Sequence, residues 1–206
     1  MLLLGQFMGL LDVFVVNVAM PAIGVGLHAS GASLQLVVGS YIVAYAMLLI
    51  TGARLGDLYG RRRMYLLGAI VFTVASLVCG FAPNIVVLVA SRFVQGAGAA
   101  VMVPQIISVI QMLFTGKARA TALSAYAVVL SSGAVFGLVV GGVLVSADLF
   151  GATWRPVFLI NVPLGLCLAL LVPRFVPPDD PPTHLPCPLH ADSTSAVWPS
   201  PHSRSS

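Results

Sequence analysis

The few residues able to do chemistry include four that lie inside long apolar segments. Asp12, in LLDVFVVNVAMPAI, and Arg92, in LVASRFVQGAGAA, are opposite charges, and Asn17 and Gln95 add neutral polar groups to the same two segments. A charge at mid-bilayer costs from about 2.5 to more than 10 kcal/mol, so such groups usually face a protein interior or a water-filled path. These four residues are therefore candidates for a proton or substrate path. Asp12 would be its titratable group, and Arg92 a fixed charge that tunes a neighbouring carboxylate.

The same charges also allow a simpler interpretation. Asp12 and Arg92 can form a structural ion pair, or Asp12 can lie at a shallower depth than the middle of its segment. At about 100° per residue, Asn17 lies about 140° around a helix from Asp12, so the first segment carries polar groups on two sides. The sequence leaves the structural and the functional interpretation open.

Long apolar segments must position these residues. The chain has 206 residues, 59% of them hydrophobic and 8% charged, with a mean hydropathy of +1.03. Soluble domains are about 25% charged, so a soluble fold, disorder, a nucleic-acid-binding module and a disulfide scaffold are all disfavoured. Apolar stretches long enough to cross a bilayer cover residues 2–24, 35–55, 64–82, 85–113, 121–146 and 155–173. None alternates with a period of two, which predicts an all-α membrane protein with six transmembrane helices.

Basic residues beside these stretches predict their orientation. The breaks after the second, fourth and sixth stretches hold Arg54, Arg61, Arg62, Arg63, Lys117, Arg119 and Arg174, whereas the opposite side has Arg155. Cytoplasmic loops carry the excess of basic residues, so we expect both termini to be cytoplasmic in the cell membrane and Trp154 to lie at the outer interface. A signal peptide over 2–24 is disfavoured because the stretch lacks a basic n-region and is too long.

The remaining composition limits partners and cofactors. The net charge of +4 comes from scattered residues, which disfavours a nucleic-acid partner, and the three cysteines have no metal-binding spacing. We therefore expect no metal and no cofactor. A serine hydrolase would need a GxSxG nucleophile and an intramembrane His, and the sequence has neither, so we expect no enzyme activity. Residues 176–206, rich in Pro and Ser, are predicted to form a disordered cytoplasmic tail after a bundle over 1–175.

Two further motifs have a structural and a functional interpretation each. In GARLGDLYGRRR, the turn with Asp57, Gly60, Arg61 and Arg62 is an orientation signal or a more specific device, in which Asp57 caps the next helix or pairs with Arg61. In SSGAVFGLVVGGVL, the four glycines are Gly133, Gly137, Gly141 and Gly142. Spacing of four places a glycine face on one side of a helix, where it permits tight packing or allows the helix to slide or bend during gating.

Taken in order, these motifs resemble the major facilitator superfamily, in its branch of drug:proton antiporters with fourteen spans. GARLGDLYGRRR is similar to the loop between the second and third helices of that family, matching at Leu55, Asp57, Gly60, Arg61 and Arg62. LDVFVVNVAMPAI resembles its first-helix signature, SRFVQGAGAA its fourth-helix motif and WRPVFLINVPLG its entry to the sixth helix. GAVFGLVVGG matches its fifth-helix antiporter motif at the glycines, with Leu138 where a Pro is usual.

The resemblance implies a fold and an activity. The six helices would form one half-bundle of an exporter that exchanges small, often amphipathic or cationic compounds for protons by rocking two halves around a central cavity. It would give Arg92 a role in proton coupling and the loop around Asp57 a role in locking and releasing one state. The family has twelve or fourteen spans, so we expect the amino-terminal half of a transporter, with a tail from a shifted reading frame or a fragmentary gene. Transport would need a second six-helix half or a homodimer. The alternative is a non-transporting membrane protein that binds a partner through its glycine faces.

Overall fold

The computed structural model describes residues 2–147 and 154–175, and the elements within these ranges are helices. They are α1 (Leu2–Gly26), α2 (Gly31–Tyr59), α3 (Arg61–Gly80), α4 (Ile85–Leu113), α5 (Gly116–Ser146), α6 (Pro156–Leu159) and α7 (Asn161–Phe175). With Pro156–Arg174 counted as one span, 6 helices of the described part are long and apolar enough to cross a membrane. The predicted all-α membrane fold with six transmembrane helices is confirmed. The predicted tail, 176–206, lies outside the described residues.

Local capping fixes where several helices begin. The side chain of Ser30 accepts a hydrogen bond from the backbone N–H of Ser33, so α2 begins at Gly31, earlier than the predicted start at 35. Asn84 caps α4 in the same way, accepting from the N–H of Val87. Gly60 is the link between α2 and α3, with φ of 97°. This backbone conformation favours glycine and permits the sharp turn that the sequence predicts.

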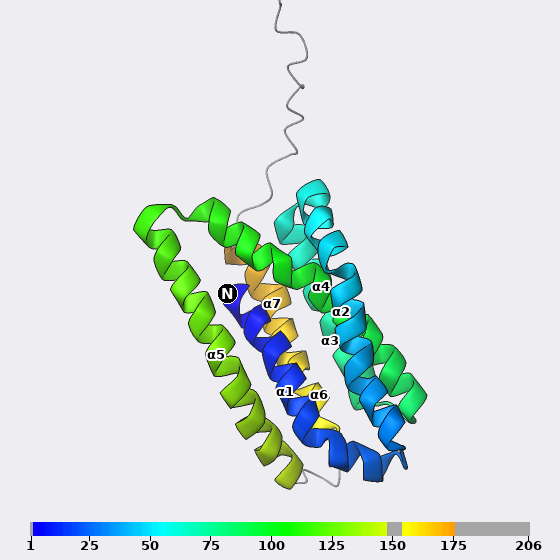
Figure 1. The fold of residues 1–206 in the computed structure, drawn as a ribbon. Coiled ribbons are helices and arrows are strands. Elements are labelled where there is room, and N and C mark those ends of the chain that lie inside the picture. Colours follow the sequence, from blue (N-terminus) through cyan, green and yellow to red (C-terminus); the bar gives the residue numbers. More distant parts are fainter. Residues whose placement is uncertain (1, 148–153, 176–206) are drawn as a thin grey trace, which may run out of the picture.

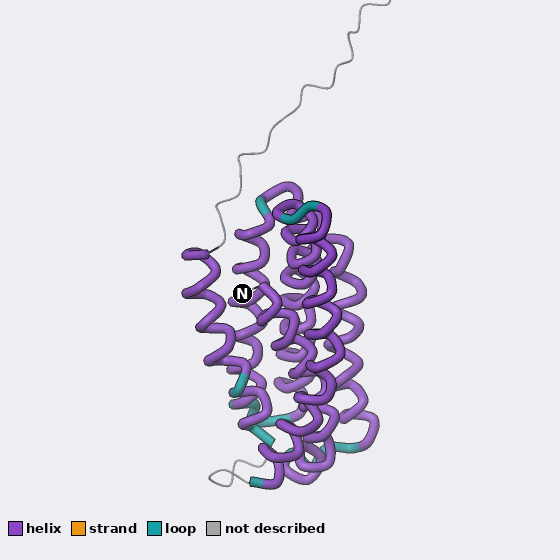
Figure 2. Tube along the Cα trace, turned by 90° about the vertical axis from the view of Figure 1, so that its left-hand side faces the viewer, coloured by secondary structure: helices purple, strands orange, loops and turns teal. Residues whose placement is uncertain are grey.

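The helices pack in two groups along one long direction. In Figure 1, α2, α3 and α4 form one group and α1 lies beside α5, with α6 and α7 next to α1. Figure 2, turned by 90°, shows the helices running roughly side by side. α4 packs against both α2 and α3, and α7 packs against α3 and α1. The α6–α7 span therefore joins the two groups.

Glycines allow α4 to approach its neighbours closely. A Cβ atom at Gly98 would lie 2.8 Å from the backbone nitrogen of Phe72 in α3. A Cβ atom at Gly96 would overlap the backbone of Tyr41 in α2. Two glycines on α4, within two turns of Arg92, thus bring three backbones together.

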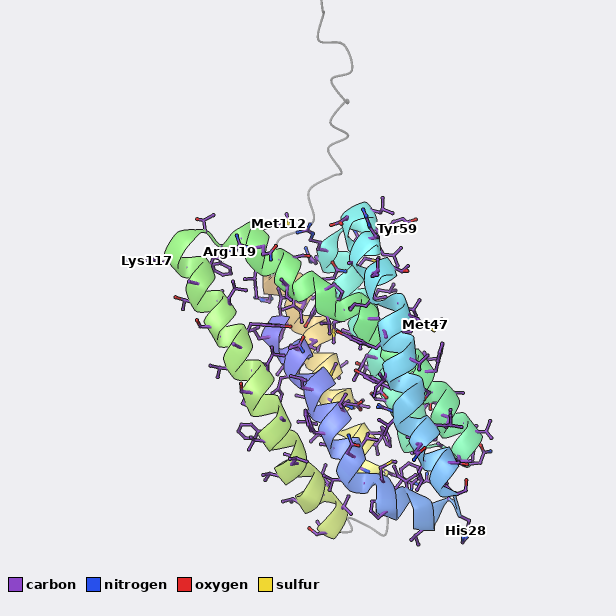
Figure 3. The ribbon with its side chains drawn as sticks, viewed as in Figure 1. His28, Met47, Tyr59, Met112, Lys117 and Arg119 are labelled. Atoms are coloured by element: carbon purple, nitrogen blue, oxygen red, sulfur yellow. The ribbon has the colours of Figure 1, made fainter. Side chains whose placement is uncertain are left out.

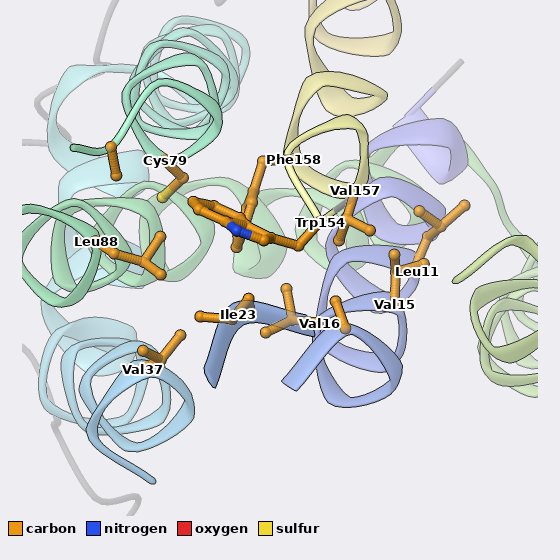
Figure 4. Packing of buried hydrophobic residues seen from close by; sticks show 12 residues of the cluster. Leu11, Val15, Val16, Ile23, Val37, Cys79, Leu88, Trp154, Val157 and Phe158 are labelled. Carbon is orange, nitrogen blue, oxygen red and sulfur yellow. The ribbon is translucent and has the colours of Figure 1, made fainter. Parts of the chain in front are cut away.

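Trp154 lies in a buried hydrophobic cluster with Leu11, Ile23 and Leu88 (Figure 4). Its indole packs edge-to-face on Phe158, with ring centroids 6.1 Å apart. Gly26 makes room for the ring, because a Cβ there would lie 2.7 Å from the indole Nε1. The ring of Trp154 thus faces the protein core, and its location at the outer bilayer interface stays a prediction.

Candidate functional site

The two charges within the apolar segments meet in the core. Nη1 of Arg92, on α4, donates to Oδ2 of Asp12, on α1, at 2.5 Å, and both side chains are fully buried. Taking two charges out of water is costly, and the cost is offset only when good geometry and further hydrogen bonds satisfy both groups. The ion pair that the sequence left as one alternative is thus present.

Gln95 connects the ion pair to α3. Its Nε2 donates to Oδ1 of Asp12 at 2.8 Å and to Oγ of Ser76 at 2.7 Å. Its Oε1 accepts from Nη1 of Arg92 at 2.6 Å. Arg92 and Gln95 lie three residues apart on one face of α4, which is why both reach the same carboxylate.

A second amide, on α7, completes the coordination of Asp12. Nδ2 of Asn161 donates to Oδ1 of Asp12 at 2.9 Å, and Asn161 is fully buried. Asp12 therefore accepts three hydrogen bonds from two helices, α4 and α7. Asn161 thereby joins the sixth span to the ion pair.

Aromatic rings and a backbone carbonyl hold the other side of the guanidinium. Cζ of Arg92 lies 4.4 Å from the ring centroid of Tyr41 and 5.9 Å from that of Phe158. Nε of Arg92 donates to the backbone oxygen of Val37, in α2. The cation–π contact with Tyr41 adds to the ion pair, so one side chain contacts α1, α2, α4 and α6.

Asn17 lies apart from this network. Its side chain is exposed, and its Nδ2 donates at 2.8 Å to the oxygen of Val13, one turn earlier in α1. Gln6 is buried and accepts a hydrogen bond from the hydroxyl of Tyr126 on α5. The structure thus brings Asp12, Arg92 and Gln95 together and leaves Asn17 on another face of α1, as its helical angle predicts.

The loop between α2 and α3 is tied to two other helices. Nη2 of Arg61 lies 2.9 Å from Oδ1 of Asp57, and its Nη1 donates to the oxygen of Ser108 on α4. Nη2 of Arg62 donates at 2.6 Å to the oxygen of Pro173 near the end of α7. The N-cap of α3 is Gly60, which has no side chain to accept a hydrogen bond. Of the two roles that the sequence allows for Asp57, the structure shows the pairing with Arg61 and not the capping of α3.

Three of the four predicted glycines face α1. A Cβ atom at Gly133, Gly137 or Gly141 would lie within 3.1 Å of Leu10, Phe14 or Val15 respectively. Gly142 has nothing within 4 Å of that position. The described structure thus places the first three in tight packing between α5 and α1, and Gly142 on open surface.

Sequence reasoning missed Asn161, Ser76 and Tyr41 as members of the site. Asn161 lies in an apolar span, within WRPVFLINVPLG. A polar amide in such a span was the one signal in the sequence that could have indicated its place in the site. Among the described residues, no group of three or more His, Cys, Asp or Glu could hold a metal ion. The site is therefore a buried ion pair surrounded by amides, hydroxyls and aromatic rings.

These features define a class of protein. Membrane-length helices packed around a buried, satisfied carboxylate and guanidinium are typical of multi-pass membrane proteins that move ions or solutes, because intramembrane charges are retained chiefly for such work. Residues 2–200 match the family model described as Major Facilitator Superfamily. The chain belongs to this superfamily. It is thus a multi-pass membrane protein of a transporter family and not an enzyme, as the sequence predicts. The match runs beyond residue 175, where we expect the bundle to end.

Relatives with printed functions support the same family. The chain is 44% identical over 173 residues to the "Probable actinorhodin transporter" of Streptomyces coelicolor, covering 82% of this chain and 30% of that protein. It is 39% identical to the "Multidrug resistance protein Stp" of Mycobacterium tuberculosis (strain CDC 1551 / Oshkosh), covering 84% of this chain and 32% of the relative. It is 40% identical to the "Cephamycin export protein CmcT" of Amycolatopsis lactamdurans, covering 82% and 34%. The chain spans about a third of the length of these relatives, which is consistent with an N-terminal half.

Proposed function

We propose that this chain is the N-terminal six-helix half of a proton-coupled exporter of small drug-like compounds. It would work in the cell membrane with a second six-helix half or a second copy, and its two parts would be the bundle 1–175 and a cytoplasmic tail 176–206. The observation that carries the proposal is the buried pair of Asp12 and Arg92 inside an amide network.

Proton coupling follows from what protonation would do to this pair. Arg92 stays charged in proteins, whereas Asp12 can be neutralised by a proton. Protonation of Asp12 would leave the buried guanidinium without its counter-ion, which is strongly unfavourable. Loss of the proton would restore the pair. The helices that carry the two residues, α1 and α4, would therefore prefer different positions in the two protonation states.

The other candidate residues have roles that depend on this step. Gln95 holds both members of the pair, and Asn17 would face the substrate path on the exposed side of α1. The loop with Asp57, Gly60, Arg61 and Arg62 would lock one state, because its hydrogen bonds join α3 to α4 and to α7. Gly133, Gly137 and Gly141 would let α5 stay close to α1 as the helices shift.

The names of the relatives support export as the direction. One relative is named for actinorhodin, another for cephamycin export, and the "Methylenomycin A resistance protein" of Bacillus subtilis is 39% identical to the chain. Orientation is supported by the basic residues. In Figure 3, Tyr59, Lys117 and Arg119 lie toward the end of the bundle opposite His28. The basic end would face the cytoplasm.

An efflux assay tests the proposal. Residues 1–175 would replace the matching segment of the probable actinorhodin transporter, and the chimera would be expressed in a drug-sensitive host beside the 206-residue chain alone. We expect the chimera to export actinorhodin or a cationic dye in a proton-dependent way, and its Asp12→Asn form to lose that export. We expect no export from the short chain unless it forms a dimer. Asn84→Ser, which keeps a helix cap, is the matched control.

Two results would contradict the proposal. Proton-dependent export by the Asp12→Asn chimera would remove Asp12 from the coupling step. Robust export by the short chain as a monomer would show that a second half is unnecessary. A stable complex with another membrane protein, without proton flux in any form, would favour the non-transporting alternative.

A further inference from the structure

One oxygen atom of the buried network lacks a hydrogen-bond partner. Oδ1 of Asn161 is the buried side-chain atom left unpaired among the described residues. A buried acceptor without a donor costs about 1–3 kcal/mol, so such an atom in a native structure needs an explanation. The same side chain uses its Nδ2 to donate to Asp12. The unpaired oxygen therefore lies one amide away from the titratable carboxylate.

The donors around Asp12 suit its charged form. Oδ1 accepts from Nε2 of Gln95 and Nδ2 of Asn161, and Oδ2 accepts from Nη1 of Arg92. A protonated carboxyl carries an O–H group that must donate. If the proton binds to Oδ1, the two amides that face it both present N–H groups, so the neutral form needs an acceptor that the charged form does not use.

Two amides could supply that acceptor, and only one of them is free to do so. Oε1 of Gln95 accepts from Nη1 of Arg92 at 2.6 Å, and its Nε2 also donates to Ser76. Turning the Gln95 amide would break both contacts. Oδ1 of Asn161 has no partner to lose. Half a turn of the Asn161 amide exchanges Nδ2 and Oδ1 and brings an acceptor toward Asp12.

We propose that Asn161 is a positioning residue that follows the protonation state of Asp12. Its Nδ2 donates to the carboxylate, and its Oδ1 accepts from the carboxyl O–H after the amide has turned. In this step a proton leaves a hydronium ion and forms an O–H bond at Oδ1 of Asp12, while Asn161 gains and loses no proton. The inference rests on the proposed function in one respect, namely that Asp12 takes up a proton during transport.

The location of Asn161 gives this exchange a consequence for the fold. Asn161 is the first residue of α7, directly after the interruption that separates α7 from α6. Its hydrogen bond to Asp12 joins the sixth span to α1. Asn161 therefore holds α7 to α1 through a different hydrogen bond in each protonation state.

Other titratable groups near Asp12 must be separated from this effect. Those that face it among the described residues are Arg92 on α4, Tyr41 on α2 and Cys79 on α3. Arg92 remains protonated across the accessible pH range. A Cys79→Ala form tests the thiol, and Tyr41→Phe tests the hydroxyl, while both keep Asn161 and Asp12.

Infrared difference spectroscopy of the full chain in lipid nanodiscs tests the proposal. Spectra at acid and alkaline pH give the carbonyl band of protonated carboxyl groups, and Asp12→Asn identifies the part that belongs to Asp12. In Asn161→Leu, which has a similar volume, we expect this band to move to higher wavenumber because the acid has lost its acceptor. The carboxylate loses a donor and the acid loses an acceptor in this variant, so the change in frequency is the result that tests the proposal.

A second variant covers the case in which Asn161→Leu does not fold. Asn161→Asp has nearly the same shape and places two carboxyl groups together, so we expect Asp12 to titrate in two coupled steps. Asn84→Ser is the control that should leave the band unchanged. An Asp12 band in folded Asn161→Leu with the frequency of the unmodified chain would overturn the proposal. A single step in Asn161→Asp, as in the unmodified chain, would overturn it as well.

The infrared test and the efflux assay can contradict their respective proposals independently of each other. The infrared band is measured without a substrate and without a second half, so it reports only on Asn161 and Asp12. Failure of the unmodified chimera to export would contradict the proposed function and leave the spectroscopic result standing. An unchanged band with normal proton-dependent export would contradict the role of Asn161 alone.

Discussion

Nη1 of Arg92 and Oδ2 of Asp12 lie 2.5 Å apart although 80 residues separate them in the sequence. α1 packs mainly against α5, and α4 packs mainly against α2 and α3. The ion pair therefore links α1 directly to α4, in addition to the α6–α7 span, which also joins the two groups of helices. Any change in the charge of Asp12 acts at this link.

The stability of the bundle should depend on the pair as a unit. Asp12→Asn leaves the buried charge of Arg92 without its partner, and Arg92→Gln does the same to Asp12. Breaking a buried ion pair in this way typically costs about 3–5 kcal/mol. The double variant removes both charges, so we expect it to lose clearly less than the sum of the single losses. Denaturant unfolding in detergent micelles gives the four free energies of the cycle. Additive losses would show that the two side chains do not interact.

Two glycines of α5 should respond differently to the same substitution. A Cβ at Gly137 would lie 2.6 Å from Cβ of Phe14, so we expect Gly137→Ala to lower the free energy of unfolding by about 1–3 kcal/mol. Gly142 has open space at that position, so Gly142→Ala should be neutral or stabilise the helix by up to about 1 kcal/mol. Thermal unfolding of both forms makes the comparison. Equal effects would contradict the observed face of α5.

The loop between α2 and α3 should affect transport more than stability. The Asp57 and Arg61 side chains are partly exposed, and ion pairs of this kind contribute about 0–1 kcal/mol. We expect Asp57→Asn in the chimera to slow export severalfold while its unfolding midpoint changes little, because the loop would set the exchange between states. Arg54→Gln, on the exposed surface of α2, is the control. An unchanged export rate in Asp57→Asn would exclude a gating role.

The orientation can be measured with single cysteines. In a chain whose own cysteines are replaced by Ala, Gly31→Cys lies at the start of α2 and Lys117→Cys at the basic end, near the start of α5. We expect a membrane-impermeant maleimide to label Gly31→Cys in intact cells, and Lys117→Cys only after permeabilisation. The reverse pattern would place the basic end outside.

The fold was largely predictable because apolar length is a strong signal in membrane proteins. Each predicted stretch corresponds to a helix of sufficient length, and Gly60 marks the turn between α2 and α3. The interruption at Ile160 was not predicted, because the apolar run of the sixth span continues through it. Packing of Trp154 into the core was also missed, since its partner Gly26 is distant in sequence.

The site was predictable only where a residue breaks the apolar pattern strongly. Asp12 and Arg92 could be selected because a charge inside a bilayer is costly and is usually paired or functional. Gln95 could be selected because it shares a helix face with Arg92. Asn161 gave a weaker signal, since an amide costs much less to bury than a charge. Its contact with Asp12 spans 149 residues, and helix periodicity carries no information over that distance.

Substrate-coupled proton release tests the central claim most directly. The chimera would be reconstituted in liposomes with a pH gradient. Uptake of actinorhodin or a cationic dye would be measured, and a pH-sensitive dye in the same sample would report the movement of protons. We predict that the unmodified chimera moves substrate and protons in opposite directions, and that Asp12→Asn abolishes the proton-driven movement while Asn84→Ser keeps it. Proton-driven transport that persists at the normal rate in Asp12→Asn would contradict a coupling role for the buried carboxylate.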